Sequence, residues 1–176
     1  MAIGNTLFPH FYTGFFQFGY VTNNIEQAIE NLKKHYGIKN FLDAGMIPSN
    51  IKLADGSIAN NELHLAFAYV GDQQVELIQP LKDESGFYAN ALKNNDANSD
   101  FEILLHHLGC RFYEIEQWHA FKQQLNPNEH SVAFENEGGA MHYLYTDERK
   151  MLGHFLEYMW LDQEGSALFD AIPQNP

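Results

Sequence analysis

The sequence predicts an α+β protein built from two β-α-β-β-β modules, one in each half of the chain. Three observations lead to this prediction. The chain has 176 residues, a length typical of one domain. Each half contains a strand-like run, then a helix-like run, then three more strand-like runs. The halves also match at an offset of 90 residues, with Gly19 on Gly109 and residues 25–27 (IEQ) on 115–117 (IEQ).

The first half begins with aromatic and branched residues at 15–21, a composition typical of a strand. Polar residues at 22–24 can cap a helix, apolar residues recur at helical spacing over 25–32, and Gly37 ends the helix. Three short runs separated by Asp-Gly and Gly-Asp turns then predict a meander: IKLA (51–54), LHLAFAYV (63–70) and QVELIQP (74–80).

A polar linker at 81–100, with one short helix expected near 87–92, leads to the second half. Residues 101–112 predict a strand, and apolar spacing over 115–125 predicts a helix that Asn126-Pro127 ends. Three further strands are expected at 131–135, 140–146 and 153–161.

The expected organisation is an N-terminal extension (1–14), one domain (15–161) with modules at 15–80 and 101–161 joined by the linker (81–100), and a C-terminal tail (162–176). The tail carries apolar residues at Leu168, Phe169 and Ile172. These residues can fold back on their own chain or contribute to a dimer.

Composition excludes several classes of partner. Ten Lys and Arg residues against 23 Asp and Glu give a formal charge of −13, so neither a nucleic acid nor an anionic membrane surface is an expected partner. No apolar run approaches the roughly 18 residues of a membrane span, and residues 1–20 lack the basic leader of a secretory signal. One cysteine, Cys110, rules out an internal disulfide. We therefore expect a cytoplasmic protein.

Four of the predicted strands carry a single conspicuous polar residue within an apolar run: Gln17, Glu76, His107 and Glu157. They match in pairs across the duplication, in the first and the last strand of each module. A buried carboxylate needs a cationic partner or a metal, and Lys and Arg are scarce. One imidazole with carboxylate and amide oxygens suits Zn, Ni, Co, Mn or Fe(II). Each residue taken alone could also face solvent.

The strand that contains His107 holds other candidates. His106 and His107 are adjacent, so alternation predicts that they face opposite sides of the strand and that one is structural. Arg111 shares the face of His107 and is a candidate anchor for a substrate carboxylate, although an ion pair with a surface acid is the alternative. Gly109 would leave room above a metal, and Cys110 is expected to be an inert core residue.

The segments QFGYVTNNIEQAIENLKKHYGI, VELIQPL, HHLGCRF and HFLEYMW, in this order and spacing, resemble the vicinal oxygen chelate superfamily over residues 15–161. This superfamily includes glyoxalase I, methylmalonyl-CoA epimerase, extradiol dioxygenases and fosfomycin or bleomycin resistance proteins. The resemblance implies a curved mixed sheet around a metal cup, with ligands at Gln17, Glu76, His107 and Glu157. Gln, Glu, His and Glu in chain order match the eukaryote-type glyoxalase I site, whereas extradiol dioxygenases have His in place of Gln17.

The resemblance implies a metal-dependent lyase or isomerase that removes the proton next to a metal-bound carbonyl, through a metal-stabilised enediolate. Glu157 is favoured over Glu76 as the base, and Zn, Ni or Co is favoured over Fe or Mn. An iron(II) dioxygenase and a metal-free resistance-type binding protein are the alternatives. The superfamily also implies a small-molecule substrate and a homodimer, and the scarcity of basic residues counts against a coenzyme A ester or glutathione conjugate as that substrate.

Overall fold

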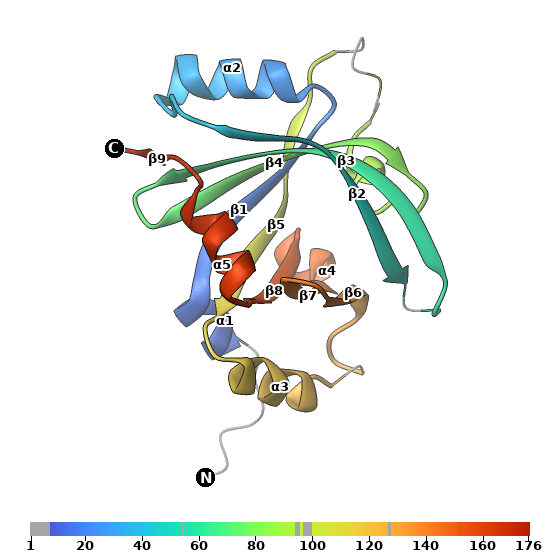
Figure 1. The fold of residues 1–176 in the computed structure, drawn as a ribbon. Helices are drawn as coiled ribbons and strands as arrows, with labels where there is room; N and C mark the ends of the chain where they lie inside the picture. Colours follow the sequence, from blue (N-terminus) through green and yellow to red (C-terminus); the bar gives the residue numbers. More distant parts are fainter. Residues whose placement is uncertain (1–7, 54, 94–95, 97–99, 127) are drawn as a thin grey trace.

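The computed structural model describes residues 8–53, 55–93, 96, 100–126 and 128–176, and shows two modules that share one curved sheet (Figure 1). The first module consists of β1 (Phe15–Thr22), α2 (Ile25–Tyr36), β2 (Leu42–Leu53), β3 (Ile58–Val70) and β4 (Gln73–Asp83). The second consists of β5 (Ile103–Phe112), α3 (Ile115–Gln124), β6 (Val132–Gly138), β7 (Met141–Asp147), the short α4 (Arg149–Leu152) and β8 (Phe155–Leu161). Outside the modules lie α1 (Phe8–Gly14), the 3-10 turn η1 (Ala89–Ala91), α5 (Gln163–Asp170) and β9 (Gln174–Asn175).

The predicted order of elements is confirmed in both halves, with four main differences in extent. Strand β3 begins at Ile58, five residues before the predicted run at 63–70. Strand β2 begins at Leu42, nine residues before the predicted strand at 51–54, because its first part is an exposed ribbon without apolar alternation. The helix expected near 87–92 is only a 3-10 turn. The extension at 1–14 contains α1. Residue 54 of the predicted strand, residues 1–7, linker residues 94–95 and 97–99, and Pro127 lie outside the described residues.

The duplication gives the sheet an approximate two-fold arrangement. Strands β1 and β5 run antiparallel at its centre, and each is flanked on its other side by the parallel last strand of its own module, β4 or β8. Strand β2 pairs with β3 along most of its length and with β6 at its end, through Lys52↔Glu135 and Leu53↔Phe134. The eight strands of the two modules therefore close into a ring with an interior.

Each long helix covers the outside of the ring. Ile25 and Ala28 of α2 pack against Ala66 and Leu77 of β3 and β4, because the apolar stripe of the helix faces the sheet. Helix α3 does the same on β5 and β8, where Trp118 lies fully buried. Figure 1 shows the two helices on opposite sides of the sheet.

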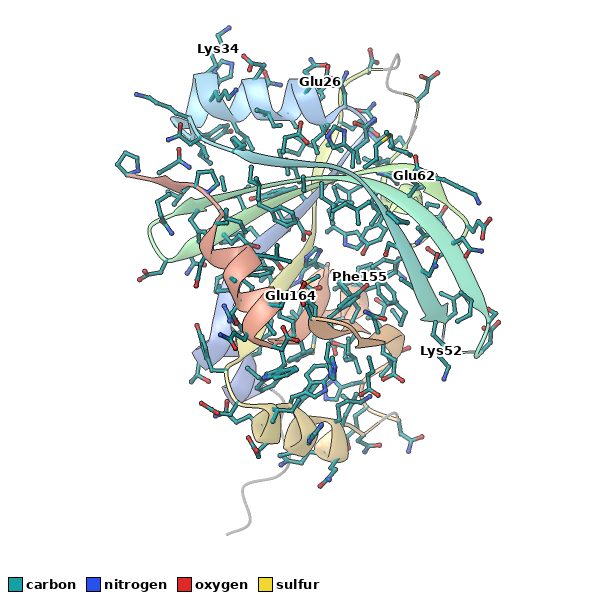
Figure 2. The ribbon with its side chains drawn as sticks, in the orientation of Figure 1. Glu26, Lys34, Lys52, Glu62, Phe155 and Glu164 are labelled. Carbon is teal, nitrogen blue, oxygen red and sulfur yellow. The ribbon has the colours of Figure 1, made fainter. Side chains whose placement is uncertain are left out.

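A ring-rich cluster fills the interior. Phe155 lies within the curve of the sheet, whereas charged side chains such as Lys34 and Lys52 lie outside it (Figure 2). The buried members of this cluster are Val21, Ile51, Ala59, Leu63, Ile78, Tyr88, Leu92, Phe134, Tyr145 and Phe155. Charged groups buried in such an apolar interior are costly unless a partner or a metal compensates them.

The C-terminal tail folds back on its own chain. Strand β9 extends the sheet beside β3, with Tyr69↔Gln174 and Val70↔Asn175 paired. The buried Asn175 side chain accepts hydrogen bonds from the backbone N–H groups of residues 39 and 40 and donates to the carbonyls of residues 40 and 69. Phe169 and Ile172 pack with Phe16. Of the two roles considered for the tail, the structure shows this one, and a dimer remains a prediction.

None of the described helices combines the length and the apolar character that a membrane span requires.

Candidate metal centre

Three of the four residues singled out in the sequence converge inside the ring. Glu76 of β4, His107 of β5 and Glu157 of β8 each offer one ligand atom, and these atoms lie within 4.8 Å of one another. Nε2 of His107 is 3.2 Å from Oε2 of Glu76 and 3.4 Å from Oε2 of Glu157. All three side chains are buried, so this is a cluster of two acids and one imidazole withdrawn from water.

Two glycines make the convergence possible. Gly19 of β1 pairs with both Glu76 and His107, and a Cβ at Gly19 would lie 1.9 Å from Cε1 of the His107 ring. By the same two-fold relation, a Cβ at Gly109 would lie 2.4 Å from Oε1 of Gln17. Each predicted ligand of the central strands therefore lies over the glycine of the opposite module. The space above Gly109 is occupied by Gln17 rather than left open.

Gln17 occupies the place that the duplication assigns to it, but the nitrogen of its amide is bound to another side chain. Its Nε2 donates a hydrogen bond to Oε1 of Gln74 at 2.7 Å. Its Oε1 is buried and accepts no hydrogen bond from any described residue. Gln74, which the sequence reasoning passed over because it begins its strand beside a turn, thus orients this amide.

The donor atoms that remain fit a cation. Oε1 of Gln17, Nε2 of His107 and Oε2 of Glu157 are all buried without a hydrogen-bond partner among the described residues. Nε2 of His107 is close to both carboxylates but aligned for a hydrogen bond with neither. A buried polar atom that lacks a partner costs about 1–3 kcal/mol, and a cation bound by Nε2 of His107 and Oε2 of Glu157, which belong to one cluster, would offset that cost. Nitrogen and oxygen donors of this kind suit a divalent transition metal.

The electrostatics of the cluster are strongly perturbed. Burial alone would lower the pKa of His107, but the Glu157 and Glu76 carboxylates beside Nε2 outweigh it and raise the pKa to about 9. Burial raises the pKa of Glu76, against the opposing effect of His107. Burial also raises the pKa of Tyr145, whose hydroxyl interacts with the Glu157 carboxylate. Such perturbed groups gathered in one place are typical of functional sites.

The expectation that His106 and His107 face opposite sides of their strand is wrong. Gly19 pairs with His107 and Tyr20 pairs with Leu105, which leaves His106 as the extra residue of a β-bulge. The bulge interrupts the alternation, so both imidazoles enter the interior and both are buried. Their Nδ1 atoms lie 3.2 Å apart. Nothing in the sequence pattern marked this bulge.

Arg111 lies two residues beyond Gly109 on the same strand and reaches the tail. Its Nη2 donates a hydrogen bond to Oγ of Ser166 at 2.8 Å, and its guanidinium lies over the Tyr113 and Phe169 rings. Within the described part of the chain it forms no ion pair, and its buried Nε has no hydrogen-bond partner. The alternative of a salt bridge to a surface acid is therefore not what the structure shows.

A search against protein-family models finds the Glyoxalase/Bleomycin resistance protein/Dioxygenase superfamily over residues 16–142, which is most of the chain. The chain belongs to this superfamily. The resemblance found in the sequence is confirmed, and so is the expected α+β architecture with its curved mixed sheet. The matched region includes Gln17, Glu76 and His107, whereas Glu157 lies beyond it.

Several solved structures share the fold over most of the chain. Methylmalonyl-CoA epimerase from Mycobacterium tuberculosis matches with a TM-score of 0.52 and 20% identity, covering 95% of this chain and 96% of that one. A variant of the Streptomyces coelicolor methylmalonyl-CoA epimerase in complex with 2-nitronate-propionyl-CoA gives 0.51 and 12%, covering 85% and 94%. A hypothetical protein from Bacillus halodurans gives 0.52 and 14%, with the same coverage of 85% and 94%. These likenesses concern the fold. A sequence comparison with curated proteins gave no match.

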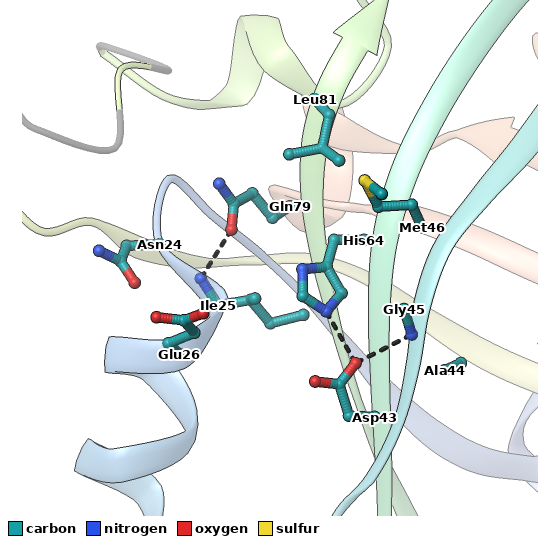
Figure 3. A pocket seen from close by; sticks show the side chains of 10 residues that line it. All are labelled: Asn24, Ile25, Glu26, Asp43, Ala44, Gly45, Met46, His64, Gln79 and Leu81. Carbon is teal, nitrogen blue, oxygen red and sulfur yellow. Dashed lines mark hydrogen bonds and ion pairs between the residues drawn. The ribbon is translucent and has the colours of Figure 1, made fainter.

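A hollow lies on the outer face of the sheet, apart from the buried cluster. A pocket of about 720 Å³ opens between the start of α2 and strands β2 to β4 (Figure 3). Its polar groups bind one another: Nε2 of His64 is 2.7 Å from Oδ1 of Asp43, and Oε1 of Gln79 accepts from the backbone N–H of Ile25. The pocket does not include Glu76, His107 or Glu157, so we place the chemistry in the interior.

Proposed function

We propose that this protein is a metal-dependent isomerase or lyase that removes a proton next to a carbonyl group. The observation that supports the proposal best is the buried cluster of Glu76, His107 and Glu157, in which donor atoms without hydrogen-bond partners face one another. Membership of the superfamily and the fold shared with epimerases agree with it at the general level.

The four proposed ligands are Gln17, Glu76, His107 and Glu157. Two carboxylates with a neutral imidazole and a neutral amide balance the charge of a divalent ion, which favours retention of Zn, Ni or Co, with Fe or Mn as further candidates. A bound ion would supply Lewis-acid polarisation of a substrate carbonyl and would stabilise the negative charge that develops on its oxygen.

The chain's own groups would move the proton. We propose Glu157 as the base, because the Tyr145 hydroxyl interacts with its carboxylate and helps to orient it. Glu76 lies on the other side of His107 from Glu157. Burial raises the pKa of Glu76, which favours proton acceptance near neutral pH, so Glu76 is the second candidate for the base. Arg111, with a buried Nε donor that has no partner among the described residues, remains the proposed anchor for a substrate carboxylate.

One observation favours a metal-free alternative. With a pKa raised to about 9, His107 can itself be the cation between the two carboxylates. The cluster could then be structural, and the interior could bind a small molecule without catalysis. Gln17 in place of a second imidazole counts against the other alternative, an iron(II) dioxygenase with two His ligands and one carboxylate.

Metal analysis of the untagged protein, purified without chelator, separates these functions. We expect about one equivalent of a divalent metal in the wild type and less than a tenth of that in Glu157→Gln and Gln17→Ala. Glu62→Gln, the same exchange at an exposed position of β3, is the matched control and should keep the metal.

Proton abstraction is measured in deuterium oxide. The Zn-, Ni- or Co-loaded protein, incubated with small α-hydroxy and α-keto carbonyl compounds and with methylmalonyl-CoA, should introduce deuterium next to the carbonyl, as followed by NMR. Stoichiometric metal in both ligand variants would show that the ligand assignment is wrong. Bound iron together with oxygen-dependent turnover would support the dioxygenase, and a metal-free wild type that no added ion stabilises would support the binding protein.

A further inference from the structure

We propose that His106 is a positioning residue, which holds His107 with its Nδ1 protonated and its Nε2 directed at Glu76 and Glu157. The inference rests on the proposed function in one respect, because Nε2 of His107 is the proposed metal-binding atom. It adds a residue that supports the site through another side chain.

The direction of each hydrogen bond follows from a backbone carbonyl. Nε2 of His106 lies 3.2 Å from the carbonyl oxygen of Phe87, and a carbonyl can only accept. Nε2 of His106 therefore carries the proton. In a neutral imidazole the other nitrogen, Nδ1, is then an acceptor. Nδ1 of His107, 3.2 Å away, must be the donor.

His106 is held in the neutral form and in one orientation. Its ring packs against those of Tyr88 and Phe155, with centroids at 5.1 and 4.9 Å, and the Phe87 ring meets it nearly at a right angle. This surrounding of rings excludes water, and His106 is buried without an acid beside it among its described partners, which disfavours a charged imidazole. Both of its nitrogens are engaged, so His106 is not itself a ligand.

The chain of bonds has a consequence for His107. With its proton fixed on Nδ1, a neutral His107 has its lone pair on Nε2, between the two carboxylates. Partners that fix the tautomer of a ligating histidine commonly change metal affinity by roughly 10–100-fold when they are removed. His106, the extra residue of the bulge, would therefore help to determine the metal affinity of the site.

The duplication shows that the bulge does not need a histidine. In β1, Phe15 pairs with Cys110 and Gln17 with Gly109, so Phe16 is the extra residue of an equivalent bulge. Phe16 packs among apolar side chains and makes no comparable hydrogen bond. The bulge thus forms without a histidine, so the histidine at position 106 is not required by the backbone. Phenylalanine is a suitable replacement for the test.

The test compares the affinity for Co(II), measured from its visible absorption, in His106→Phe, His106→Asn and Phe87→Leu. We expect His106→Phe to bind Co(II) roughly 10–100-fold more weakly than the wild type. His106→Asn offers Oδ1 as an acceptor near the position of Nδ1 and should recover most of the loss. Phe87→Leu alters the packing around His106 but leaves both hydrogen-bond partners in place, and should stay close to the wild type. An equal loss in Phe87→Leu and His106→Phe would overturn the proposal.

Nitrogen-15 NMR tests the tautomers without metal or activity, and keeps the proposal testable if a variant fails to fold. We expect the wild type to show His106 protonated only on Nε2 and His107 protonated on Nδ1. A proton on Nδ1 of His106 would refute the inference. If the wild type binds no metal while the NMR pattern is as expected, the proposed function fails and the hydrogen-bond assignment stands.

Discussion

Replacing Gly19 with alanine would place a methyl group inside the space of the His107 ring. The added Cβ would lie 1.9 Å from Cε1, 2.2 Å from Nε2 and 2.4 Å from Nδ1 of that ring. Ordinary contacts begin near 3.4 Å, so the imidazole would have to retreat by about 1.5 Å. Bonds to a metal tolerate only about 0.2 Å of displacement, so the substitution should remove His107 from the site.

The cost to stability follows from overpacking. Forcing a methyl group into a packed interior typically costs about 1–3 kcal/mol. For a domain of this size each kcal/mol lowers the melting temperature by about 2–4 °C. We therefore expect Gly19→Ala to melt about 2–12 °C below the wild type, and to bind Co(II) at least 100-fold more weakly, as measured by thermal denaturation and by titration with Co(II).

Gly138→Ala is the matched control. A Cβ at Gly138 meets nothing within 4 Å, and its φ lies outside the left-handed region. This variant should keep both the melting temperature and the metal affinity of the wild type. If Gly19→Ala behaves like Gly138→Ala, His107 does not approach β1 closely in the protein, and the proposed placement of its Nε2 in a metal site is wrong.

Three further predictions concern pH, reactivity and the tail. In chelator, stability should fall as pH drops below 6.5, because burial lowers the folded-state pKa of His106 to about 3. Stability should also fall as pH rises from 6.5 through about 9, because the carboxylates raise the folded-state pKa of His107. Urea titrations across this range should show both decreases. If the decrease at low pH is unchanged in His106→Phe, its assignment to His106 is wrong. Cys110, buried and with its pKa raised by burial to about 12, should resist iodoacetamide in the folded protein at pH 8.5 and react in urea; equal rates would contradict its burial. Asn175→Ala removes four hydrogen bonds and should cost about 1–3 kcal/mol by urea denaturation, whereas Gln174→Ala, an exposed neighbour, should change little.

Much of the fold could be predicted because the signals were periodic. Apolar spacing and turn residues marked both long helices and six of the eight module strands closely, since each buries one face, and they marked β3 only from residue 63 onward. The first part of β2 could not be predicted in this way. Residues 42–50 are mostly exposed and include Gly45 and Pro48, so their strand is defined by pairing with β3 rather than by burial.

Part of the candidate site could likewise be predicted from the sequence, and part could not. Glu76, His107 and Glu157 could be singled out because each interrupts an apolar strand, and the structure brings them together. His106 could not be assigned to the interior, because the period of two on which the prediction rested fails at a bulge. Gln74 follows another glutamine rather than interrupting an apolar run, so the sequence did not single it out. Its hydrogen bond to Gln17 depends on the register of β1 and β4.

The exchange of side chain and glycine between the modules links positions that lie far apart in the chain. His107 occupies the space that Gly19 leaves, and Gln17 occupies the space that Gly109 leaves. A larger residue at either glycine is compatible only with a smaller residue on the facing strand, so these four positions are constrained to vary in concert during divergence. A change of ligand at position 17 or 107 is therefore tied to the glycine of the other half, and recombination of either half with a foreign module would preserve these two side chains only if the incoming strand brought its glycine with it.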